Sequence, residues 1–345
     1  MQTIIRMLSL AVGGVLLVVI FRGVDFPATV SLIENVGYYF LPIYAVYGFG
    51  CLLDTAAWKI ILDIPGKTIS FGKLLQIHIA GESMYRFIPA GVIVGEGVKI
   101  FLLKKQSHFT GPQIISSLVI RKLLMGLSQG IYIGSGFFLG ILLAQRIGLI
   151  EITSLSLSLF ILVIFLLMGV MLSRGLLFDW AFRVLRSIPF IRGRVERQSL
   201  FFERTDIVLK DFFIHKRRKS VFACLLFFGG WLTEMLETYL ILVALGTKVL
   251  LYQVMLFEPV VSLMRSLAFV LPGGLGVIDS GYLTAFASVG IGTALIGGVA
   301  FVIIKRSKEL FWIIIGLVLM WLQGGKVPDN TLVPSLKPGI APEII

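Results

Sequence analysis

Long apolar segments dominate this sequence and limit what it can fold into. A helix that crosses a bilayer needs about 20 mostly apolar residues, and suitable segments lie at 4–21, 38–61, 113–143, 152–172 and 220–245. Two shorter ones, 290–304 and 308–323, are separated by the sequence KRSK. With 57% hydrophobic and only 14% charged residues, the composition is unlike that of ordinary soluble domains. We therefore predict an all-α, multi-pass membrane protein with about seven spanning helices.

A strongly basic segment sets the predicted orientation. Residues 174–219 hold twelve Lys or Arg against five acidic residues, and such an excess marks cytoplasmic loops. We predict a cytoplasmic loop here, a cytoplasmic N-terminus and a place in the plasma (inner) membrane, with residues 7–21 as an uncleaved anchor. Within the loop, LLFDWAFRVLRSIPFI has apolar residues at helical spacing, which favours a helix on the anionic inner leaflet. A solvated basic loop is the equal alternative.

Two further apolar stretches, 69–103 and 252–288, contain charges and a Pro/Gly break near the middle. Basic residues flank the first stretch on both sides, so both its ends are expected in the cytoplasm. If KRSK at 305–308 is also cytoplasmic, the second stretch enters and returns from the outside. Broken segments at bilayer depth are tolerated only inside protein or beside a wet cavity. We therefore predict two opposed re-entrant helical hairpins.

The two broken stretches share one spacing, in which a glycine follows the proline by two positions and an acid follows it by seven. The spacing occurs at Pro89, Gly91 and Glu96, and again at Pro272, Gly274 and Asp279. A charged residue also precedes each proline by seven positions, Glu82 in the first copy and Arg265 in the second. Such breaks in two halves of a transporter indicate inverted repeats. The outgoing helices would present free N–H groups near the midplane, which suits a phosphate.

The charges in the first break allow two interpretations. Glu82 and Arg86 are spaced i and i+4, and Glu96 and Lys99 are spaced i and i+3, so each pair can neutralise itself locally. Alternatively, Arg86 and Lys99, together with Arg265, receive a phosphate, because arginine is a strong bidentate phosphate ligand. The sequence leaves both interpretations open.

Four more charged residues lie well inside predicted spanning helices: Arg121, Lys122, Glu234 and Glu237. Of the neighbours Arg121 and Lys122, we expect Arg121 to face the bundle and Lys122 to extend to the cytoplasmic surface. Glu234 and Glu237 share one helix face, so at least one is expected to be protonated or paired with an arginine such as Arg265 or Arg121. They form either a proton relay or cationic headgroup site, or a structural ion pair. Residues nearer predicted helix ends are expected at the interface: Asp54, Lys59, Glu258 and Glu309.

Several classes of function have no support in the sequence. The three histidines and two cysteines have no metal-ligand spacing, and no P-loop, H-E-x-x-H or G-x-S-x-G motif occurs. We therefore predict no metal or other cofactor and no catalytic set. The formal net charge of +12 is explained by cytoplasmic loops and anionic headgroups, so nucleic acid is not expected as a partner.

Two blocks resemble a known family, the lysylphosphatidylglycerol synthase transmembrane region, also called the flippase-like domain family. RFIPAGVIVGEGVKIFLL is similar to its R-x-x-P-x-G-x-x-G-E pattern, and LAFVLPGGLGVIDSGY to its P-x-G-G-L-G-x-x-[ED]-x-G pattern. The resemblance implies a bacterial or archaeal integral membrane domain over residues 1–325, followed by a Pro-rich tail at 326–345. In fused members the domain moves aminoacylated phosphatidylglycerol between leaflets. The aminoacyl-transferase domain of those members does not follow here, so we expect a stand-alone member.

The function expected from these features is a lipid flippase. A phospholipid, or a related anionic or aminoacylated lipid, would pass its headgroup through a polar midplane cavity. One alternative is a membrane enzyme in a lipid-biosynthetic pathway, polyprenyl or hopanoid, with Glu96 and Asp279 as acid and base. Another is a scaffold in such a pathway, docking through its basic loop. Membrane lipids are the expected ligands, and a lipid-biosynthetic enzyme or a second copy of the chain is the candidate protein partner.

Overall fold

The chain is helical almost throughout the part that its computed structural model describes, which comprises residues 26–87, 91–144, 149–188, 192–251, 253–255, 258, 261–262, 264, 277–289 and 295–323. In that part, the pairing of β type is an isolated bridge between Ile64 and Lys67. The all-α class is therefore confirmed. The helices are α2 (Phe26–Val36), the short 3-10 helix η1 (Gly37–Tyr39), α3 (Phe40–Ile61), α4 (Phe71–Phe87), α5 (Gly91–Gln106), α6 (Gly111–Ala144), α7 (Leu149–Ser173), α8 (Leu177–Arg186), α9 (Arg192–Glu196), α10 (Ser199–His215), α11 (Arg217–Ala244), α13 (Val277–Val289) and α14 (Leu295–Leu322).

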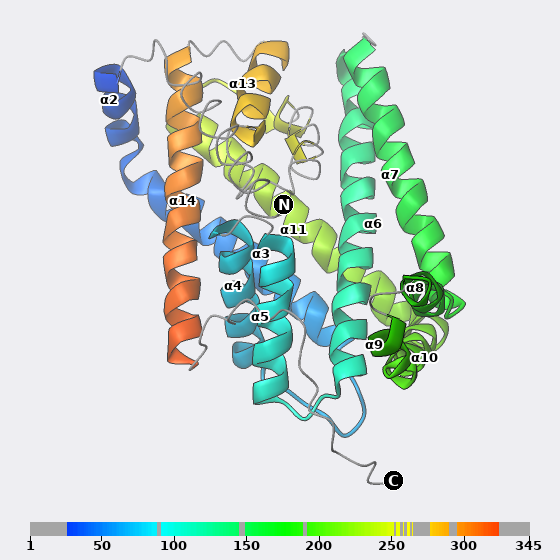
Figure 1. The fold of residues 1–345 in the computed structure, drawn as a ribbon. Coiled ribbons are helices and arrows are strands. Elements are labelled where there is room, and N and C mark those ends of the chain that lie inside the picture. Colours follow the sequence, from blue (N-terminus) through cyan, green and yellow to red (C-terminus); the bar gives the residue numbers. More distant parts are fainter. Residues whose placement is uncertain are drawn as a thin grey trace.

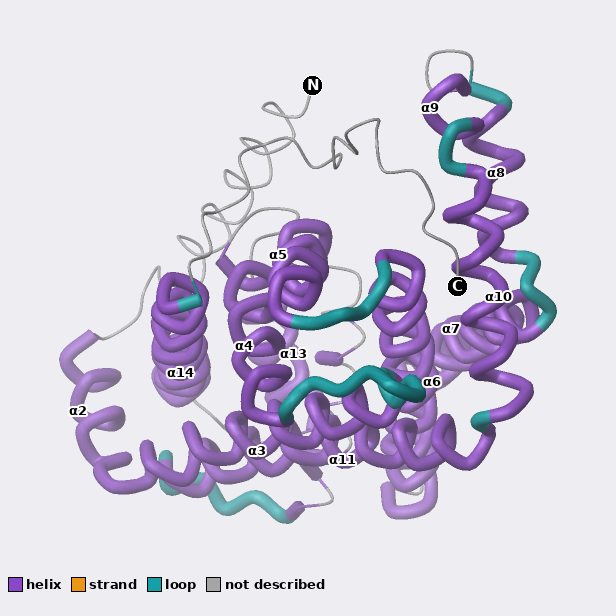
Figure 2. Tube along the Cα trace, turned by 90° about the horizontal axis from the view of Figure 1, so that it is seen from below, coloured by secondary structure: helices purple, strands orange, loops and turns teal. Residues whose placement is uncertain are grey.

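The long helices form a bundle around the α4–α5 pair. Helices α14 and α6 stand on either side of α4 and α5, while α3 packs along α11 behind them (Figures 1 and 2). The α4–α5 pair occupies the lower half of Figure 1 and α13 the upper half. Ile43, Tyr132 and Phe301, from α3, α6 and α14, are buried in one apolar cluster. The charged site described below lies between the two halves of this bundle.

Among the described residues, three helical segments are long and apolar enough to cross a bilayer: Pro27–Ile61, Gly111–Leu139 and Arg217–Ala244. They correspond to the segments predicted at 38–61, 113–143 and 220–245. The segment predicted at 152–172 forms α7, but it reaches the same criterion only together with α8, at a bend of 91°. The first predicted segment, 4–21, lies outside the described residues.

The prediction of two short spans separated by KRSK is wrong. Residues 295–322 form the single 28-residue helix α14, and Lys305, Arg306, Lys308 and Glu309 lie near its middle. At 1.5 Å per residue such a helix is about 42 Å long, enough to cross a bilayer once. The three cations of KRSK were predicted in a cytoplasmic loop, because unpaired charges are costly to insert into lipid. Here the neighbouring helices supply partners for all four charged residues.

Helices α4 and α5 form an antiparallel hairpin with a very close backbone approach. A Cβ on Gly95 would lie 2.5 Å from the carbonyl oxygen of Gly81, so no larger residue fits without a shift. The two open ends of the hairpin meet at one end of the molecule, where Gln323 contacts Gln76 at 3.2 Å and Gln106 at 2.9 Å. Helices of 17 and 16 residues are also shorter than a full span. The predicted hairpin at 69–103 is thus present as a helical pair, whereas the break of its counterpart at 252–288 lies outside the described residues.

The basic segment predicted as a loop is largely helical. Helix α8 begins under the carboxylate of Asp206, which accepts hydrogen bonds from the backbone N–H groups of Phe178 and Asp179 at 3.1 and 2.8 Å. Such a carboxylate satisfies the free N–H groups of a first helical turn. Phe178 also packs against Phe202 of α10, while Trp180 of α8 remains 53% exposed. Of the two alternatives for this segment, the amphipathic helix is present as α8, and its position on the inner leaflet stays a prediction.

Candidate functional site

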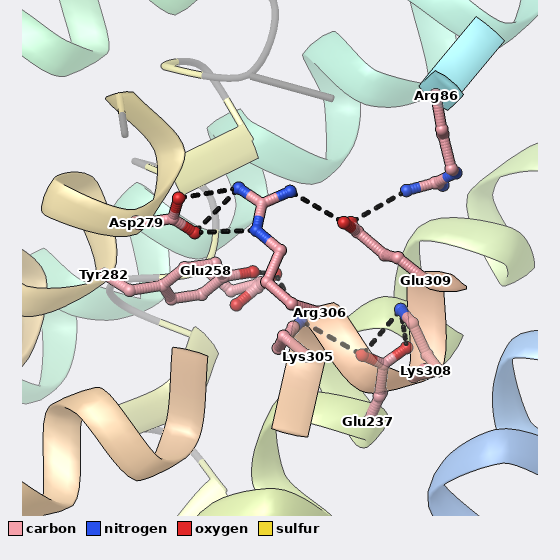
Figure 3. A network of polar contacts seen from close by, with 9 residues as sticks. All are labelled: Arg86, Glu237, Glu258, Asp279, Tyr282, Lys305, Arg306, Lys308 and Glu309. Carbon is pink, nitrogen blue, oxygen red and sulfur yellow. Dashed lines mark hydrogen bonds and ion pairs between the residues drawn. The ribbon is translucent and has the colours of Figure 1, made fainter. Parts of the chain in front are cut away.

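Arg306 of α14 is the centre of the first group of charged contacts. Its Nη2 atom donates to both carboxylate oxygens of Asp279 on α13, at 2.7 and 2.8 Å, and its Nη1 atom donates to Glu309 at 2.7 Å (Figure 3). Forked arginine–carboxylate pairs fix both partners in orientation. Asp279, the acid predicted near the start of the second outgoing helix, is therefore ion-paired with Arg306 of α14.

Glu309 joins this group to the hairpin. Its carboxylate lies 3.0 Å from Nη1 of Arg86, near the end of α4, and also accepts from Arg306 (Figure 3). The guanidinium of Arg86 lies 5.2 Å from the ring of Tyr47, within cation–π range. The Nε atom of Arg86 is buried and has no hydrogen-bond partner among the described residues. One carboxylate thus bridges the two halves of the molecule and leaves Arg86 with unused donor capacity.

Two lysines of α14 form ion pairs with Glu237 of α11. Lys308 Nζ lies 2.8 Å from each carboxylate oxygen, and Lys305 Nζ lies 3.4 Å from one of them. Lys305 is also 3.9 Å from Glu258, which accepts hydrogen bonds from Thr238 and Tyr282 at 2.9 and 3.0 Å. Among the described residues, Glu237 therefore pairs with lysines of α14, whereas Arg265, one of the arginines expected near the two acids, lies outside the described residues.

A second group of charged contacts holds the hairpin to α6. Lys99 of α5 lies 2.8 Å from Glu82 of α4 and 3.1 Å from Glu96. From α6, Lys122 reaches Glu96 at 2.9 Å, and Arg121 lies 3.5 Å from Glu82 and 3.6 Å from Glu96. Lys99 and Arg121 are almost fully buried. Two acids and three cations from three helices therefore form one network.

The pattern of local neutralisation holds for only one of the two predicted pairs. Glu96 and Lys99 do pair along α5. Glu82 instead pairs across the hairpin with Lys99, and Arg86 pairs with Glu309 of α14. Glu82 and Arg86 are therefore neutralised by residues of other helices, so their pairing depends on the tertiary structure.

Arg121 faces the bundle, as predicted, and is 0% exposed. Its Nη2 atom lies 3.3 Å from Nδ1 of His78, and its guanidinium is 5.9 Å from the ring of Trp58. The Nε and Nη1 atoms have no hydrogen-bond partner within the described part of the chain. The Lys122 side chain is 39% exposed, and its ammonium group pairs with Glu96 at 2.9 Å.

A polar cavity of about 70 Å³ lies beside both networks, between α3, α4, α6 and α11. A space of this size holds a few water molecules, and its lining is polar enough to bind them. The acidic and basic side chains at its wall are Asp54, His78, Glu82, Arg86, Glu234 and Glu237. Three helices, α3, α4 and α11, thus direct ionisable groups into one small space inside the bundle.

The structure places most of the sequence-predicted site residues in or beside this region. Gly91 begins α5, where a Cβ would lie 2.8 Å from Cα of Tyr85. The other described members are Glu82, Arg86, Glu96, Lys99, Arg121, Glu234, Glu237 and Asp279. Four predicted members lie outside the described residues: Pro89, Arg265, Pro272 and Gly274.

Several residues of the site were expected elsewhere. Asp54 lines the cavity, Glu258 is only 1% exposed, and Glu309 lies in the middle of α14, so their expected interfacial positions are wrong. Lys305, Arg306 and Lys308 had been expected in a loop. The sequence did contain a signal for a single helix here, because the apolar runs on the two sides of KRSKE together have about the length of one spanning helix.

The two networks also support the internal repeat. In each copy, the acid that follows the proline by seven positions pairs with a cation of the next long helix, Glu96 with Lys122 of α6 and Asp279 with Arg306 of α14. Helices α5 and α13 carry these acids in opposite halves of the molecule (Figure 1). The shared spacing therefore corresponds to a shared contact.

Comparisons with known proteins agree with this architecture. The model of the family described as "Lysylphosphatidylglycerol synthase TM region" matches residues 6–322. A UPF0104 membrane protein of Pyrococcus horikoshii is 23% identical over 320 residues, which cover 89% of this chain and 93% of that protein. No solved structure matches the chain. Because the family model spans almost all of the described helices and both charged networks, the chain belongs to the lysylphosphatidylglycerol synthase TM region family.

Proposed function

We propose that this protein moves a phospholipid, or a related anionic or aminoacylated lipid, between the leaflets of the plasma membrane. The observation that carries the proposal is the connected set of buried charges around the polar cavity. The polar headgroup would pass between the α4–α5 hairpin and helices α11 and α14, while the acyl chains stay in the surrounding lipid. In this arrangement the hairpin is re-entrant and its tip lies near the middle of the bilayer.

The number and connectivity of the charges favour transport over simple structural pairing. Each ionisable side chain at the bilayer centre costs about 2.5–3.5 kcal/mol on insertion scales. Replacing buried ion pairs with packed apolar residues is often neutral or stabilising, so stability alone gives little reason to keep them. A pathway for a charged headgroup gives such a reason.

Arg86 is the residue best placed to receive the headgroup phosphate. It lines the cavity, it is held by a single carboxylate, and its Nε atom has no hydrogen-bond partner in the described part of the chain. A phosphate that displaced Glu309 from Arg86 would leave Glu309 still bound to Arg306. Headgroup binding would therefore expose no unpaired carboxylate.

The cavity must open during transport. Its volume of about 70 Å³ holds water but is well below the roughly 300 Å³ of small ligand sites. The hairpin meets α14 through Arg86 and Glu309, a contact that a phosphate can exchange. We infer that movement of the hairpin relative to α14 alternately opens the space to either leaflet, as in other transporters built from inverted repeats.

Reconstitution into liposomes tests the proposal. Labelled phosphatidylglycerol and lysyl-phosphatidylglycerol in the inner leaflet become accessible to an external quencher only if they are translocated. We expect the Arg86→Ala variant to slow translocation about tenfold or more, because it loses one charge-assisted hydrogen bond to the headgroup phosphate. Arg183→Ala is the matched control, because Arg183 lies on α8 in an exposed pair with Asp179.

Two outcomes would contradict the proposal. If the wild-type protein translocates none of the lipids offered, or if Arg86→Ala transports them as fast as wild type, the cavity is not the route. Conversion of a lipid-linked substrate without translocation would favour the membrane-enzyme alternative. In the structure, the acid and base of that alternative are both engaged, Asp279 by Arg306 and Glu96 by Lys99 and Lys122.

A further inference from the structure

A second recess lies at the end of the bundle where α3 finishes and α11 begins. It is an open groove of about 780 Å³ between these helix ends, the loop after α3 and the start of α4. It shares no lining residue with the cavity beside the charged networks. Its volume falls within the range of small-molecule sites.

The rim of the groove is basic. The charged residues that line it are Lys59, Asp63, Lys67, Arg218 and Lys219. Its one acid is already engaged, because Asp63 is ion-paired with Lys219 and its backbone carbonyl accepts from Lys216 at 2.8 Å. Arg218 is exposed, and its side chain makes no hydrogen bond or ion pair with any other described residue. The groove therefore offers uncompensated positive charge.

The floor of the groove is apolar. It is formed by Ile60, Ile69, Phe71, Phe222 and Leu226. Phe222 is 55% exposed, although it stands one turn after the basic start of α11. An apolar floor under a cationic rim complements an amphipathic anion with a charged head and a hydrocarbon chain.

The position of the groove points to the source of that ligand. Ile61 ends and Arg217 begins two of the helical segments that are long and apolar enough to cross a bilayer. The groove therefore lies at the level where hydrocarbon gives way to headgroups. Clusters of Lys and Arg directly beside a spanning helix favour the cytoplasmic leaflet and bind its anionic lipids.

We propose that this groove binds one anionic phospholipid of the cytoplasmic leaflet. The phosphate lies among Arg218, Lys59 and Lys67, and an acyl chain lies along Phe222 and Leu226. The proposal concerns a bound lipid at the end of the bundle and does not depend on transport through the cavity.

Lipid binding to the purified full chain in detergent tests this site. Native mass spectrometry would measure retained lipid with phosphatidylglycerol, with phosphatidylcholine and with soluble glycerol phosphate. We expect tight binding of phosphatidylglycerol only, and about tenfold or more weaker binding in the double variant Lys59→Ala, Arg218→Ala. The matched control is Arg217→Ala with Lys104→Ala, which removes two exposed cations that do not line the groove.

A further variant separates the acyl contact from the charge. Phe222→Ala keeps every charge and changes a half-exposed side chain, so folding should be spared. We expect it to weaken phosphatidylglycerol binding several-fold, about the effect of losing part of a buried apolar contact. Equal binding of phosphatidylcholine, equal binding of glycerol phosphate, or equal losses in the control double variant would each overturn the proposal.

Discussion

Arg86 of α4 and Glu309 of α14 lie 3.0 Å apart, from Nη1 to Oε1, and both side chains are less than one-fifth exposed. The pair connects the hairpin of the first half of the chain with the middle of the last described helix. Because Glu309 also binds Arg306, and Arg306 binds Asp279, this contact continues to α13 (Figure 3). The two parts of the internal repeat are thus linked through side chains of α14.

Removal of Glu309 should destabilise the protein by about 3 kcal/mol or more, because Arg86 then remains buried without a carboxylate partner. Removal of Arg86 should cost less, because Glu309 remains bound to Arg306. The double variant Arg86→Ala, Glu309→Ala should lose less than the sum of the single variants. We expect a coupling free energy of about 1–3 kcal/mol from reversible unfolding in detergent. Additive losses would show that the two side chains do not interact in the folded protein.

Glu237→Gln should be among the most damaging single changes in α11. It leaves Lys308, which is 4% exposed, and Lys305, which is 8% exposed, without the carboxylate that binds both. The expected loss in the free energy of unfolding is about 3 kcal/mol or more. This loss would be measured as a lower midpoint of thermal unfolding than that of the wild type.

Replacement of both members of the Glu237 pair provides the control. Glu237→Leu with Lys308→Met removes the buried charges together and should recover much of the lost stability. If this double variant is less stable than Glu237→Gln, the contribution of the site cannot be explained by the unpaired lysine.

Gly95→Ala should separate the two helices of the hairpin. The new Cβ would lie 2.5 Å from the carbonyl oxygen of Gly81 and 3.1 Å from Cβ of Tyr85. Overpacking of this kind costs about 1–3 kcal/mol. Gly72→Ala is the control on the same hairpin, because its Cβ would meet nothing within 4 Å, and it should be neutral or stabilising by up to about 1 kcal/mol. Similar thermal midpoints for both variants would argue against the close approach.

Acidification should loosen the attachment of the loop after α3 to α11. The hydrogen bond from Lys219 lowers the pKa of Asp63 below its ordinary value of 3.8. A lowered pKa gives a stabilising contribution that is complete above the unfolded-state pKa, about 3.9, and is lost as the pH falls through the folded-state pKa. Between about pH 5 and pH 2, the wild type should therefore lose more stability than Asp63→Asn. Parallel pH profiles of the two proteins would contradict this.

The long apolar helices could be predicted from the sequence with little error. The segments predicted at 38–61 and 220–245 appear as Phe40–Ile61 and Arg217–Ala244. Their positions are set by length and hydrophobicity, which are local properties, because a helix in lipid satisfies its own backbone hydrogen bonds. The helix in the basic segment was one of two equal alternatives in the sequence, indicated by the helical spacing of its apolar residues.

Helix α14 was mispredicted because local hydropathy treats every charge as exposed. KRSKE breaks an apolar run and resembles a cytoplasmic loop, yet Lys308 is almost buried and bound to Glu237 of α11. Whether a charge ends a membrane helix depends on whether a partner stands opposite it. That partner lies on another helix far away in the sequence.

By itself, the sequence determined the helical class, the main apolar helices, the shared Pro-Gly-acid spacing and the list of charges that had to be accommodated. The tertiary structure decided which charges pair: Glu82 with Lys99, Arg86 with Glu309, and Glu237 with Lys308. It also decided that α14 is one helix and that a polar cavity lies beside the hairpin. Hydrophobic periodicity acts over one or two helical turns, whereas charge pairing acts over a few ångströms in space, so only the folded arrangement of helices fixes it.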